Sequence, residues 1–346
     1  MKTYSLSPRQ QHILYMFEKQ ENMTIQDILS VINTTKVTIN RDLKDLVENR
    51  YVEQHGKSRT TYYTLSPQYQ IIKPVDIEKY FSEEIDKRKI RKGFNFDIFQ
   101  YISGIFTEKE LEYFTKLNTE YQQHITSLSP ILLKKEYERL TIDLSWKSSK
   151  IEGNTYSLLE TEKLLLHKEE SKNHTKEEAI MIINHKKALD YIRAHTKDFS
   201  HLTVKKIEDI HSLLIKDLNV QRNIRKHPVG IIGTNYKPLD NTFQIKEALE
   251  NMCKAVNKKM DGFSKSLWVF TLIAYIQPFE DGNKRTSRLL TNAVLLANNI
   301  APLSYRSIDE IEYKKAIILF YEQNNISYLK KLFMEQLEFA TGNYIF

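Results

Sequence analysis

The sequence predicts a mainly helical protein with a small amount of β-structure. Apolar residues recur at three- and four-residue spacing over long stretches, such as LWVFTLIAYI at 267–276 and LLTNAVLLA at 289–297. This spacing is the period of an α-helix. The chain of 346 residues holds only 9 glycines and 8 prolines, the residues that most often interrupt helices. Short alternating runs occur between 51 and 66. The length allows two domains or more.

The composition favours a cytoplasmic protein with packed cores. Hydrophobic residues make up 41% of the chain, and the single cysteine, Cys253, excludes an internal disulfide framework. No apolar run has membrane-spanning length, and the start, MKTYSLSPRQQ, lacks the apolar core of a signal peptide, so we expect no membrane partner. The net charge of +7 fits nucleic acid or nucleotide partners, and it fits a general compositional bias equally well.

Residues 1–66 predict a small domain that begins with three helices. In SPRQQHILYMFEKQ, Ser7 is an N-cap and Pro8 is the first helical residue. MTIQDILSVI forms a second helix capped by Thr24, and KVTINRDLKDLVENR at 36–50 forms a third. The runs YVEQHG and TTYYTLS then alternate like two short strands around the turn GKSR.

Three helices and a hairpin in this order resemble a winged helix-turn-helix, whose third helix enters the major groove of DNA. Lysine and arginine would contact phosphates there, and Asn40 could contact a base edge. The basic surplus of this region is small, so the fold could instead serve protein contacts, including a homodimer, or act as a spacer. The candidate DNA-binding residues are Lys36, Thr38, Asn40, Arg41, Lys44, Lys57 and Arg59.

A connector is expected at 67–94. Pro67 and Pro74 end the second strand, and a charged helix follows them. We expect the second domain to run from 95 to 346.

The segment IQPFEDGNKRTSR at 276–288 predicts a phosphate site at the start of a helix. Gly282 allows a tight turn, and the free N–H groups of the next helical turn favour an anion. Asn283 can either bond a phosphate or hold the loop. Arg285 and Arg288 share a helix face and can clamp phosphates.

Two further residues complete this segment. Phe279 would anchor the loop in the core, and Asp281 could hold the Mg²⁺ that accompanies nucleotide phosphates. The whole segment resembles the signature of the Fic family, and the matching positions are 279, 281, 282, 283, 284, 285 and 288. The resemblance implies an all-helical domain that binds ATP and, in most members, transfers AMP to a protein hydroxyl.

The resemblance also assigns roles to individual residues. It implies metal binding by Asp281, α- and β-phosphate binding by Asn283 and the loop amides, phosphate binding by Arg285 and γ-phosphate binding by Arg288. YKKAIILFYEQNN, from 313, resembles the family's final helices, and Tyr313 would help to wall the adenine. The nucleotide-binding set is thus Gly282, Asn283, Lys284, Arg285, Arg288 and Tyr313.

A second match, SSKIEGN at 148–154, resembles the inhibitory motif of the family's subgroup with an N-terminal inhibitory helix. The matched residues are Ser148, Glu152 and Gly153, at the end of a helix expected at about 140–153. The resemblance implies that Glu152 competes with the γ-phosphate for Arg288. An ordinary helix end capped by Gly153 fits the same residues.

A third match, RKHPVGIIGTNYKPLD at 225–240, resembles the family's β-hairpin flap, which pairs with an extended piece of the target protein. Ile231, Ile232 and Gly233 are the expected contacts. An ordinary surface hairpin is the alternative.

Two positions depart from the family pattern. Gln277 stands where the family has the histidine that removes the hydroxyl proton, and an amide offers no base near neutral pH. Lys284 resembles the death-on-curing branch, which uses the site for phosphorylation. We expect His211 to be a packed or capping histidine away from the loop.

Three hypotheses follow from these residues. The first is an adenylyltransferase-like protein whose catalytic set is Gln277, Asn283 and Arg285, inhibited by Glu152 and weak or inactive because of Gln277. The second is a nucleotide-sensing, DNA-binding transcriptional regulator without catalysis. The third is a scaffold without a ligand, which the complete set of metal and phosphate residues disfavours.

Overall fold

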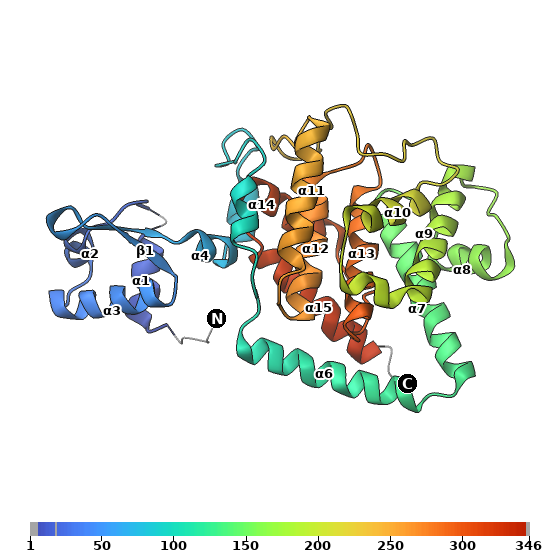
Figure 1. Ribbon diagram of the computed structural model, residues 1–346, viewed down its shortest axis with the longest axis horizontal. Coiled ribbons are helices and arrows are strands. Elements are labelled where there is room, and N and C mark those ends of the chain that lie inside the picture. Colours follow the sequence, from blue (N-terminus) through green and yellow to red (C-terminus); the bar gives the residue numbers. More distant parts are fainter. Residues whose placement is uncertain (1–5, 18, 344–346) are drawn as a thin grey trace.

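The computed structural model describes residues 6–17 and 19–343, and it has the mainly helical fold class that the sequence predicts. An N-terminal unit lies at one end of the molecule, and a larger helical body makes up the rest (Figure 1). The two units have separate hydrophobic clusters. No helix in the described part of the chain is long and apolar enough to cross a membrane.

The N-terminal unit has the predicted order of elements. The helices α1 (Pro8–Met16), α2 (Ile25–Val31) and α3 (Lys36–Glu48) precede the strands β1 (Val52–His55) and β2 (Tyr62–Leu65), with a short 3₁₀ turn, η1 (Ser58–Thr60), between the strands. Ser7 and Thr24 cap α1 and α2 as expected. The strands pair antiparallel, with Val52 opposite Leu65.

The connector contains two short helices, α4 (Pro67–Ile72) and α5 (Ile77–Ser82). Beyond Ser82 the chain is turned and extended until the 3₁₀ helix η2 (Phe96–Gln100). The side chain of Ile71 belongs to the hydrophobic core of the body, and its carbonyl accepts a hydrogen bond of 2.6 Å from the amide of Ile326. The connector is therefore fixed on the body from α4 onward.

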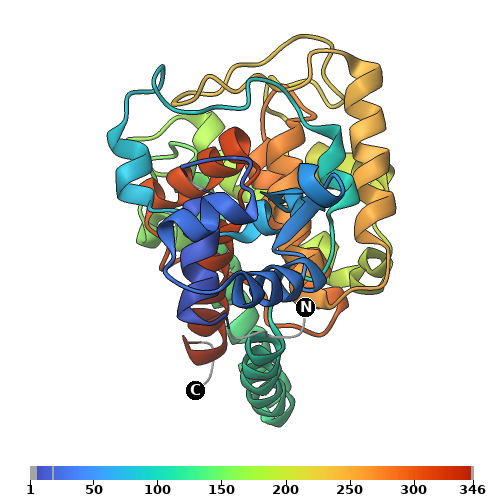
Figure 2. The same ribbon diagram turned by 90° about the vertical axis from the view of Figure 1, so that its left-hand side faces the viewer.

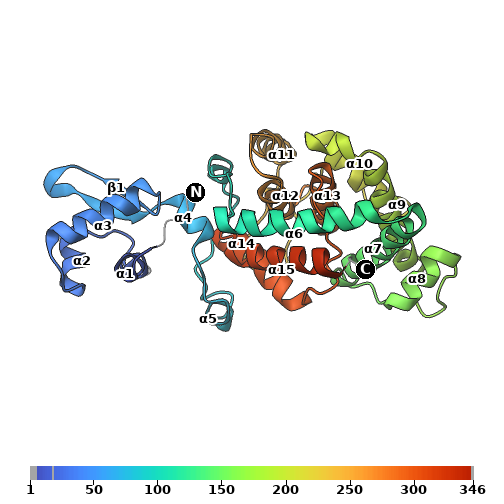
Figure 3. The ribbon, with the colours of Figure 1, turned by 90° about the horizontal axis from the view of Figure 1, so that it is seen from below.

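The body is a helical bundle built around two adjacent helices, α12 and α13 (Figures 1 and 3). Every residue of α12 from Phe263 to Ile276 is buried, because its apolar side chains cover all faces of the helix. The remaining elements surround this pair. They are α6 (Glu108–Ser127), α7 (Pro130–Ile151), α8 (Leu158–His167), α9 (Lys176–Ala194), η3 (Thr196–Ser200), α10 (Val204–Leu214), α11 (Thr242–Val256), α12 (Gly262–Ile276), α13 (Asn283–Ala297), α14 (Glu310–Gln323) and α15 (Ser327–Asn343).

The segment at 225–240 differs from the β-hairpin that the sequence suggested. These residues, all within the described chain, form no strand, and the sheet pairs only β1 with β2. The amides that a hairpin would use bond to other parts of the body: Arg225 N–H donates to the carbonyl of Pro278 at 3.0 Å, and Lys237 N–H donates to that of Lys92 at 2.9 Å. Because those donors are already used, no ladder forms across the segment.

Candidate functional site

The loop between α12 and α13 is held in shape by its own side chains. Asn283 closes it twice, because its Oδ1 accepts from Phe279 N–H and its Nδ2 donates to the Phe279 carbonyl, both at 2.8 Å. The Phe279 ring is fully buried and stacks on His211 with 3.6 Å between ring centroids. Of the two roles expected for the Asn283 side chain, the structure therefore shows the one that holds the loop.

The first turn of α13 leaves its amides open to an anion. Gly282 is the N-cap residue, with a φ of 80°, and no side chain caps the helix there. By contrast, Asp261 caps α12 and Asn241 caps α11 with side-chain oxygens. Uncapped N–H groups at a helix start attract negative charge. A side chain at Gly282 would need the left-handed conformation and would pack at 3.4 Å from His211.

Arg285 brings buried and unsatisfied donors to this helix start. Its residue exposure is 1%, and its Nη2 donates to Asp281 Oδ2 at 3.0 Å. Its Nε and Nη1 have no hydrogen-bond partner among the described residues. Unpaired buried donors are costly, and a phosphate oxygen would satisfy them. These atoms therefore fit the phosphates of a nucleotide.

Arg288, one turn further along α13, is fully buried and fully engaged by the chain itself. Its Nε donates to Ser148 Oγ at 2.9 Å and its Nη2 to the Ser148 carbonyl at 2.8 Å. The Nη1 donates to the hydroxyl of Tyr313 at 3.0 Å, and Nη2 also meets Glu152 Oε1 at 2.9 Å. Each guanidinium nitrogen of Arg288 thus already donates to another residue of the chain.

Glu152 lies between two cations at the end of α7. Its Oε2 accepts from Lys284 Nζ at 2.8 Å, while Oε1 accepts from Arg288. Burial would raise the pKa of Glu152, but Arg288 and then Lys284 outweigh it and lower the pKa to about 2. The carboxylate is thus ionised near neutral pH. It is the carboxylate that Arg288 and Lys284 share in this arrangement.

Comparison with known proteins identifies the two units. The model of the Fic/DOC family matches residues 201–295, which include the whole loop and the start of α13. The chain carries a Fic/DOC domain. The model of a winged helix DNA-binding domain matches residues 6–68, so a winged-helix domain precedes the Fic/DOC domain.

Individual relatives agree with the family match. A probable protein adenylyltransferase of Aquifex aeolicus is 27% identical over 167 residues, which are 44% of this chain and 50% of that protein. The chain thus spans half the length of this curated relative. Fic-1 of C. elegans superposes with a TM-score of 0.59 at 20% identity, covering 68% of this chain and 70% of that one. A Fic domain containing signaling protein of Bacteroides thetaiotaomicron gives 0.56 at 20% identity, covering 67% and 96%. These two structures share the fold.

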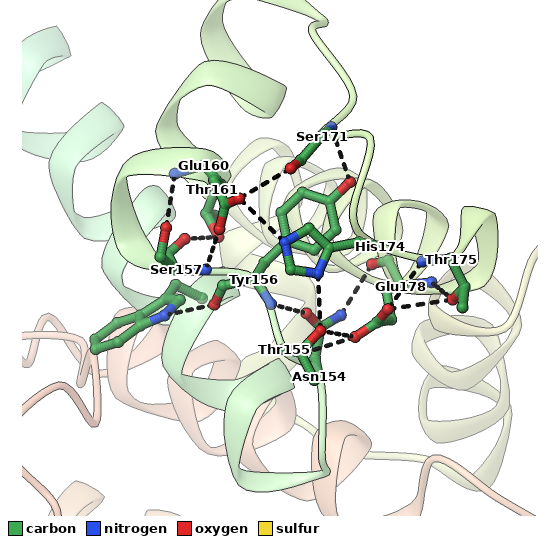
Figure 4. Close-up of polar contacts among 11 residues, drawn as sticks. Asn154, Thr155, Tyr156, Ser157, Glu160, Thr161, Ser171, His174, Thr175 and Glu178 are labelled. Carbon is green, nitrogen blue, oxygen red and sulfur yellow. Dashed lines mark hydrogen bonds and ion pairs between the residues drawn. The ribbon is translucent and has the colours of Figure 1, made fainter.

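The end of α7 is anchored by the residues that follow Glu152. Gly153, with a φ of 97°, ends the helix, and its amide donates to the carbonyl of Lys150 at 2.9 Å. Beyond it, Asn154 Nδ2 donates to the Glu178 carbonyl at 2.9 Å, and Thr155 Oγ1 donates to Glu178 Oε1 at 2.7 Å (Figure 4). Glu152 is therefore presented to Arg288 by a well-connected turn.

Two buried histidines support the site, and the sequence assigned neither a place there. His185 of α9 lies with its Nε2 2.9 Å from Ser148 Oγ, the same hydroxyl oxygen that accepts from Arg288 Nε. Burial, and then the charges of Arg288 and Arg285, hold the pKa of His185 well below its usual value. In the sequence, His185 lies among the apolar positions of a helix, and this pattern indicates only a packed histidine.

His211 is packed, as expected, but it lies against the loop instead of away from it. Its Nε2–H donates to the carbonyl of Asp281 at 3.0 Å, in addition to the stacking on Phe279. Burial lowers its pKa to about 4. The neutral ring supports the loop and does not take the place of the histidine that the family has at position 277.

Gln277 ends α12 in the left-handed region, with a φ of 51°. Its Nε2 donates inward to the Ala274 carbonyl at 2.6 Å and to the Tyr321 hydroxyl at 3.2 Å. Its carbonyl accepts from Arg225 Nε at 2.7 Å, a contact that the sequence did not suggest. The side chain of Gln277, the residue that replaces the family's histidine, is thus hydrogen-bonded to the protein interior.

Tyr313 contacts Arg288, and Asp281 contacts Arg285. Tyr313 is fully buried, with its hydroxyl on Arg288, so in this conformation it positions the guanidinium and does not line an open wall. Asp281 has a side chain that is 65% exposed and ion-pairs with Arg285. The described residues contain no cluster of three or more potential metal ligands. A single carboxylate fits Mg²⁺ only together with phosphate oxygens.

The candidate target and DNA contacts differ in how exposed they are. In the flap segment, Ile232 is 98% exposed, Ile231 is half-buried against the core, and Gly233 has a φ of 91°. On α3, Thr38 is half-buried and hydrogen-bonded to Thr35, and Val37, which was not among the candidates, is 78% exposed. The other candidates are all exposed: Lys36, Asn40, Arg41, Lys44, Lys57 and Arg59.

Proposed function

We propose that the Fic domain binds ATP with its phosphates on the open start of α13, and that the protein is an adenylyltransferase-like protein whose transfer activity is weak or lost. The unpaired Nε and Nη1 of buried Arg285 carry this proposal, because a phosphate oxygen would satisfy both donors. The relative from Aquifex aeolicus, a probable protein adenylyltransferase, supports AMP transfer as the family activity.

Each residue of the site has a part in the proposed reaction. The amides after Gly282, with Arg285, hold the phosphates, and Asn283 keeps the loop in shape. Asp281 would bind Mg²⁺ beside the phosphates, where the metal would neutralise their charge. The target hydroxyl oxygen would bond to the α-phosphorus as the bond to pyrophosphate breaks.

The hydroxyl proton must leave in that step, and Gln277 cannot accept it. Its amide nitrogen already donates to Ala274 and Tyr321, and an amide has no basic site near pH 7. Loss of a positioned base costs about 10²–10⁴ in rate. We therefore assign slow or absent turnover to this chain and retain nucleotide binding.

Glu152 acts in this proposal as an inhibitory latch. It takes the nitrogen of Arg288 that a γ-phosphate would use, and it also takes Lys284. We favour AMP transfer over phosphorylation as the ancestral activity, because Lys284, the residue that resembles the phosphorylating branch, is here part of this latch.

Calorimetry with ATP and Mg²⁺ tests the proposal directly. Glu152→Gly frees Arg288 and Lys284 and should bind ATP at least tenfold more tightly than the unaltered protein. Glu138→Gly, an exposed position on the same helix, serves as the control and should leave the affinity unchanged. The absence of heat with Glu152→Gly, in a protein that still unfolds cooperatively, would refute nucleotide binding.

DNA binding by α3 is a second proposed function, carried by the exposed basic face of that helix within the winged-helix domain. With it, the protein would be a regulator that senses nucleotide. Arg41→Ala should weaken binding to DNA fragments in fluorescence anisotropy and lower the dependence of log K on log salt by about 1. Lys109→Ala, in the body, is the control. Equal affinities and slopes for both variants would exclude this role for α3.

A further inference from the structure

The connector runs along the flap and occupies one edge of its backbone. Arg88 Nη2 donates to the Gly233 carbonyl at 3.0 Å, and Lys237 N–H donates to the Lys92 carbonyl at 2.9 Å. Between these contacts, Asn235 Nδ2 donates to Asp86 Oδ1 of the connector at 2.9 Å. Figure 2 shows the two segments together along the same edge of the body.

On the flap, these contacts have the spacing of an extended segment, whereas on the connector they fall on 88, 86 and 92 and follow no strand register. They fall on flap positions 233, 235 and 237, every second residue. The residues between them face the body, since Tyr236 is buried and its hydroxyl donates to the Tyr275 carbonyl at 3.1 Å. An extended backbone presents its N–H and C=O groups alternately to its two sides. One side of the flap is therefore already paired, although no regular ladder forms.

A buried ion pair holds the connector in this position. Arg88 Nη1 lies 3.2 Å from Glu322 Oε2, and the two side chains are 3% and 0% exposed. Tyr80 donates to the same carboxylate oxygen at 2.6 Å, and the amide of Arg91 donates to the Glu322 carbonyl at 2.8 Å. A buried charged pair is stable only in a well-fitted geometry, and it therefore specifies one position of the segment.

We propose that connector residues 83–93 are an intramolecular partner of the flap, and that a target segment must displace them to pair with it. The inference rests on the proposed function, AMP transfer to a protein hydroxyl, and it takes 225–240 as the segment that binds the target, as the family resemblance implies. A backbone edge accepts one extended partner at a time. The Gly233 carbonyl and the Lys237 amide are not free while the connector is in place.

The displaced segment also indicates the chemistry of a matching target. The connector presents DKRKIRK at 86–92, a stretch rich in lysine and arginine that leaves a turn at 85–88 and then has no regular structure. Its one buried cation, Arg88, is neutralised by Glu322 on the body. A target segment that takes this place is therefore basic, with an arginine or lysine that reaches Glu322. This inhibition is separate from that of Glu152, because it blocks the target and not the nucleotide.

Hydrogen exchange of the flap amides tests the contact without nucleotide or target. We would combine Asp86→Ala with the neutral pair Arg88→Gln and Glu322→Gln, and expect the Lys237 amide to exchange at least tenfold faster. Lys87→Ala is the matched control, because its side chain is 73% exposed and its ion pair is with Glu84 only. Unchanged exchange in the combined variant would overturn the proposal. If that variant does not fold, Asp86→Ala alone, at an exposed position, should still accelerate exchange about twofold, and no acceleration would overturn it.

A synthetic peptide of residues 83–93 tests whether the edge accepts a separate segment. Added to a variant with only Asp86→Ala and Arg88→Gln, which keeps Glu322, the peptide should slow exchange of the Lys237 amide, and the same peptide with Arg88→Ala should protect less. A lack of protection by either peptide would show that the edge is no receptor for extended segments. Failure of ATP to bind Glu152→Gly would refute the proposed function and leave these exchange results standing, so the two failures are distinguishable.

Discussion

The two ends of the loop between α12 and α13 differ in what they leave available for chemistry. At the α13 end, the helix start has no side-chain cap, and Arg285 keeps two buried donors unpaired. At the α12 end, the Gln277 amide nitrogen is used twice by the interior. The difference teaches that phosphate binding and proton removal depend on separate residues. One can therefore be lost while the other persists.

The largest expected effect comes from restoring a base at the α12 end. Gln277→His together with Glu152→Gly should raise AMP transfer by about 10²–10⁴ over Glu152→Gly alone, since that is the usual contribution of a positioned base. Labelling with α-³²P-ATP measures this effect on the protein itself and on lysate proteins. If both variants bind ATP but incorporate the same amount of label, the missing base at position 277 does not limit AMP transfer.

The next effect concerns stability at the α13 end. Arg288→Ala leaves the buried carboxylate of Glu152 without its main partner and removes four hydrogen bonds. We expect the free energy of unfolding in urea to fall by about 3–5 kcal/mol. Arg41→Ala on the exposed winged helix should change it by no more than about 0.5 kcal/mol. A similar small change for both arginines would mean that the latch carries no buried charge.

The pH dependence of stability should report the same latch. The folded-state pKa of Glu152, about 2, lies below its ordinary value of 4.5. Its contribution is therefore complete above about pH 5 and is lost as the pH falls toward 2, by about 3 kcal/mol in all. Urea unfolding between pH 7 and 3 should show a steeper loss for the unaltered protein than for Glu152→Gln. Parallel curves would contradict the lowered pKa.

The smallest effect is expected for Lys284, whose side chain is 32% exposed. Lys284→Ala removes the outer partner of Glu152 but leaves Arg288 in place. Because solvent screens this pair, stability should change by less than about 1 kcal/mol. The ATP affinity of Lys284→Ala should differ only a few-fold from that of the unaltered protein. Calorimetry measures it, with Glu152→Gly as the comparison. A loss of affinity as large as that of Arg285→Ala would make Lys284 a main phosphate ligand and not part of the latch.

Much of the fold could be predicted because local signals agree with the final structure. Ser7, Thr24 and the alternating runs at 51–66 defined the winged-helix domain, and the period of 267–276 defined α12. The flap was predicted as a hairpin because its sequence resembles one. Its amides bond to Lys92 and to the loop instead, and such long-range partners leave no local pattern.

The candidate site was likewise found only in part. Gly282, Asn283, Arg285 and Arg288 were recognised from their spacing, and Glu152 from its motif. The sequence did not show that Lys284 pairs with Glu152, or that His185 and His211 lie beside the loop. A histidine on the inner face of a helix looks the same in sequence wherever that face packs. Its neighbours come from other helices.

The sequence by itself determined the helices, the loop that joins α12 to α13, and the absence of a base at position 277, because each depends on residue types at fixed local spacing. The family resemblance already implied that Glu152 meets Arg288, and the tertiary structure alone decided the other charged contacts. It placed α7 so that Glu152 reaches Lys284 as well as Arg288, and it placed the connector so that Arg88 reaches Glu322 and the flap. Buried charges must find partners, and in a bundle those partners come from helices that are distant in the chain.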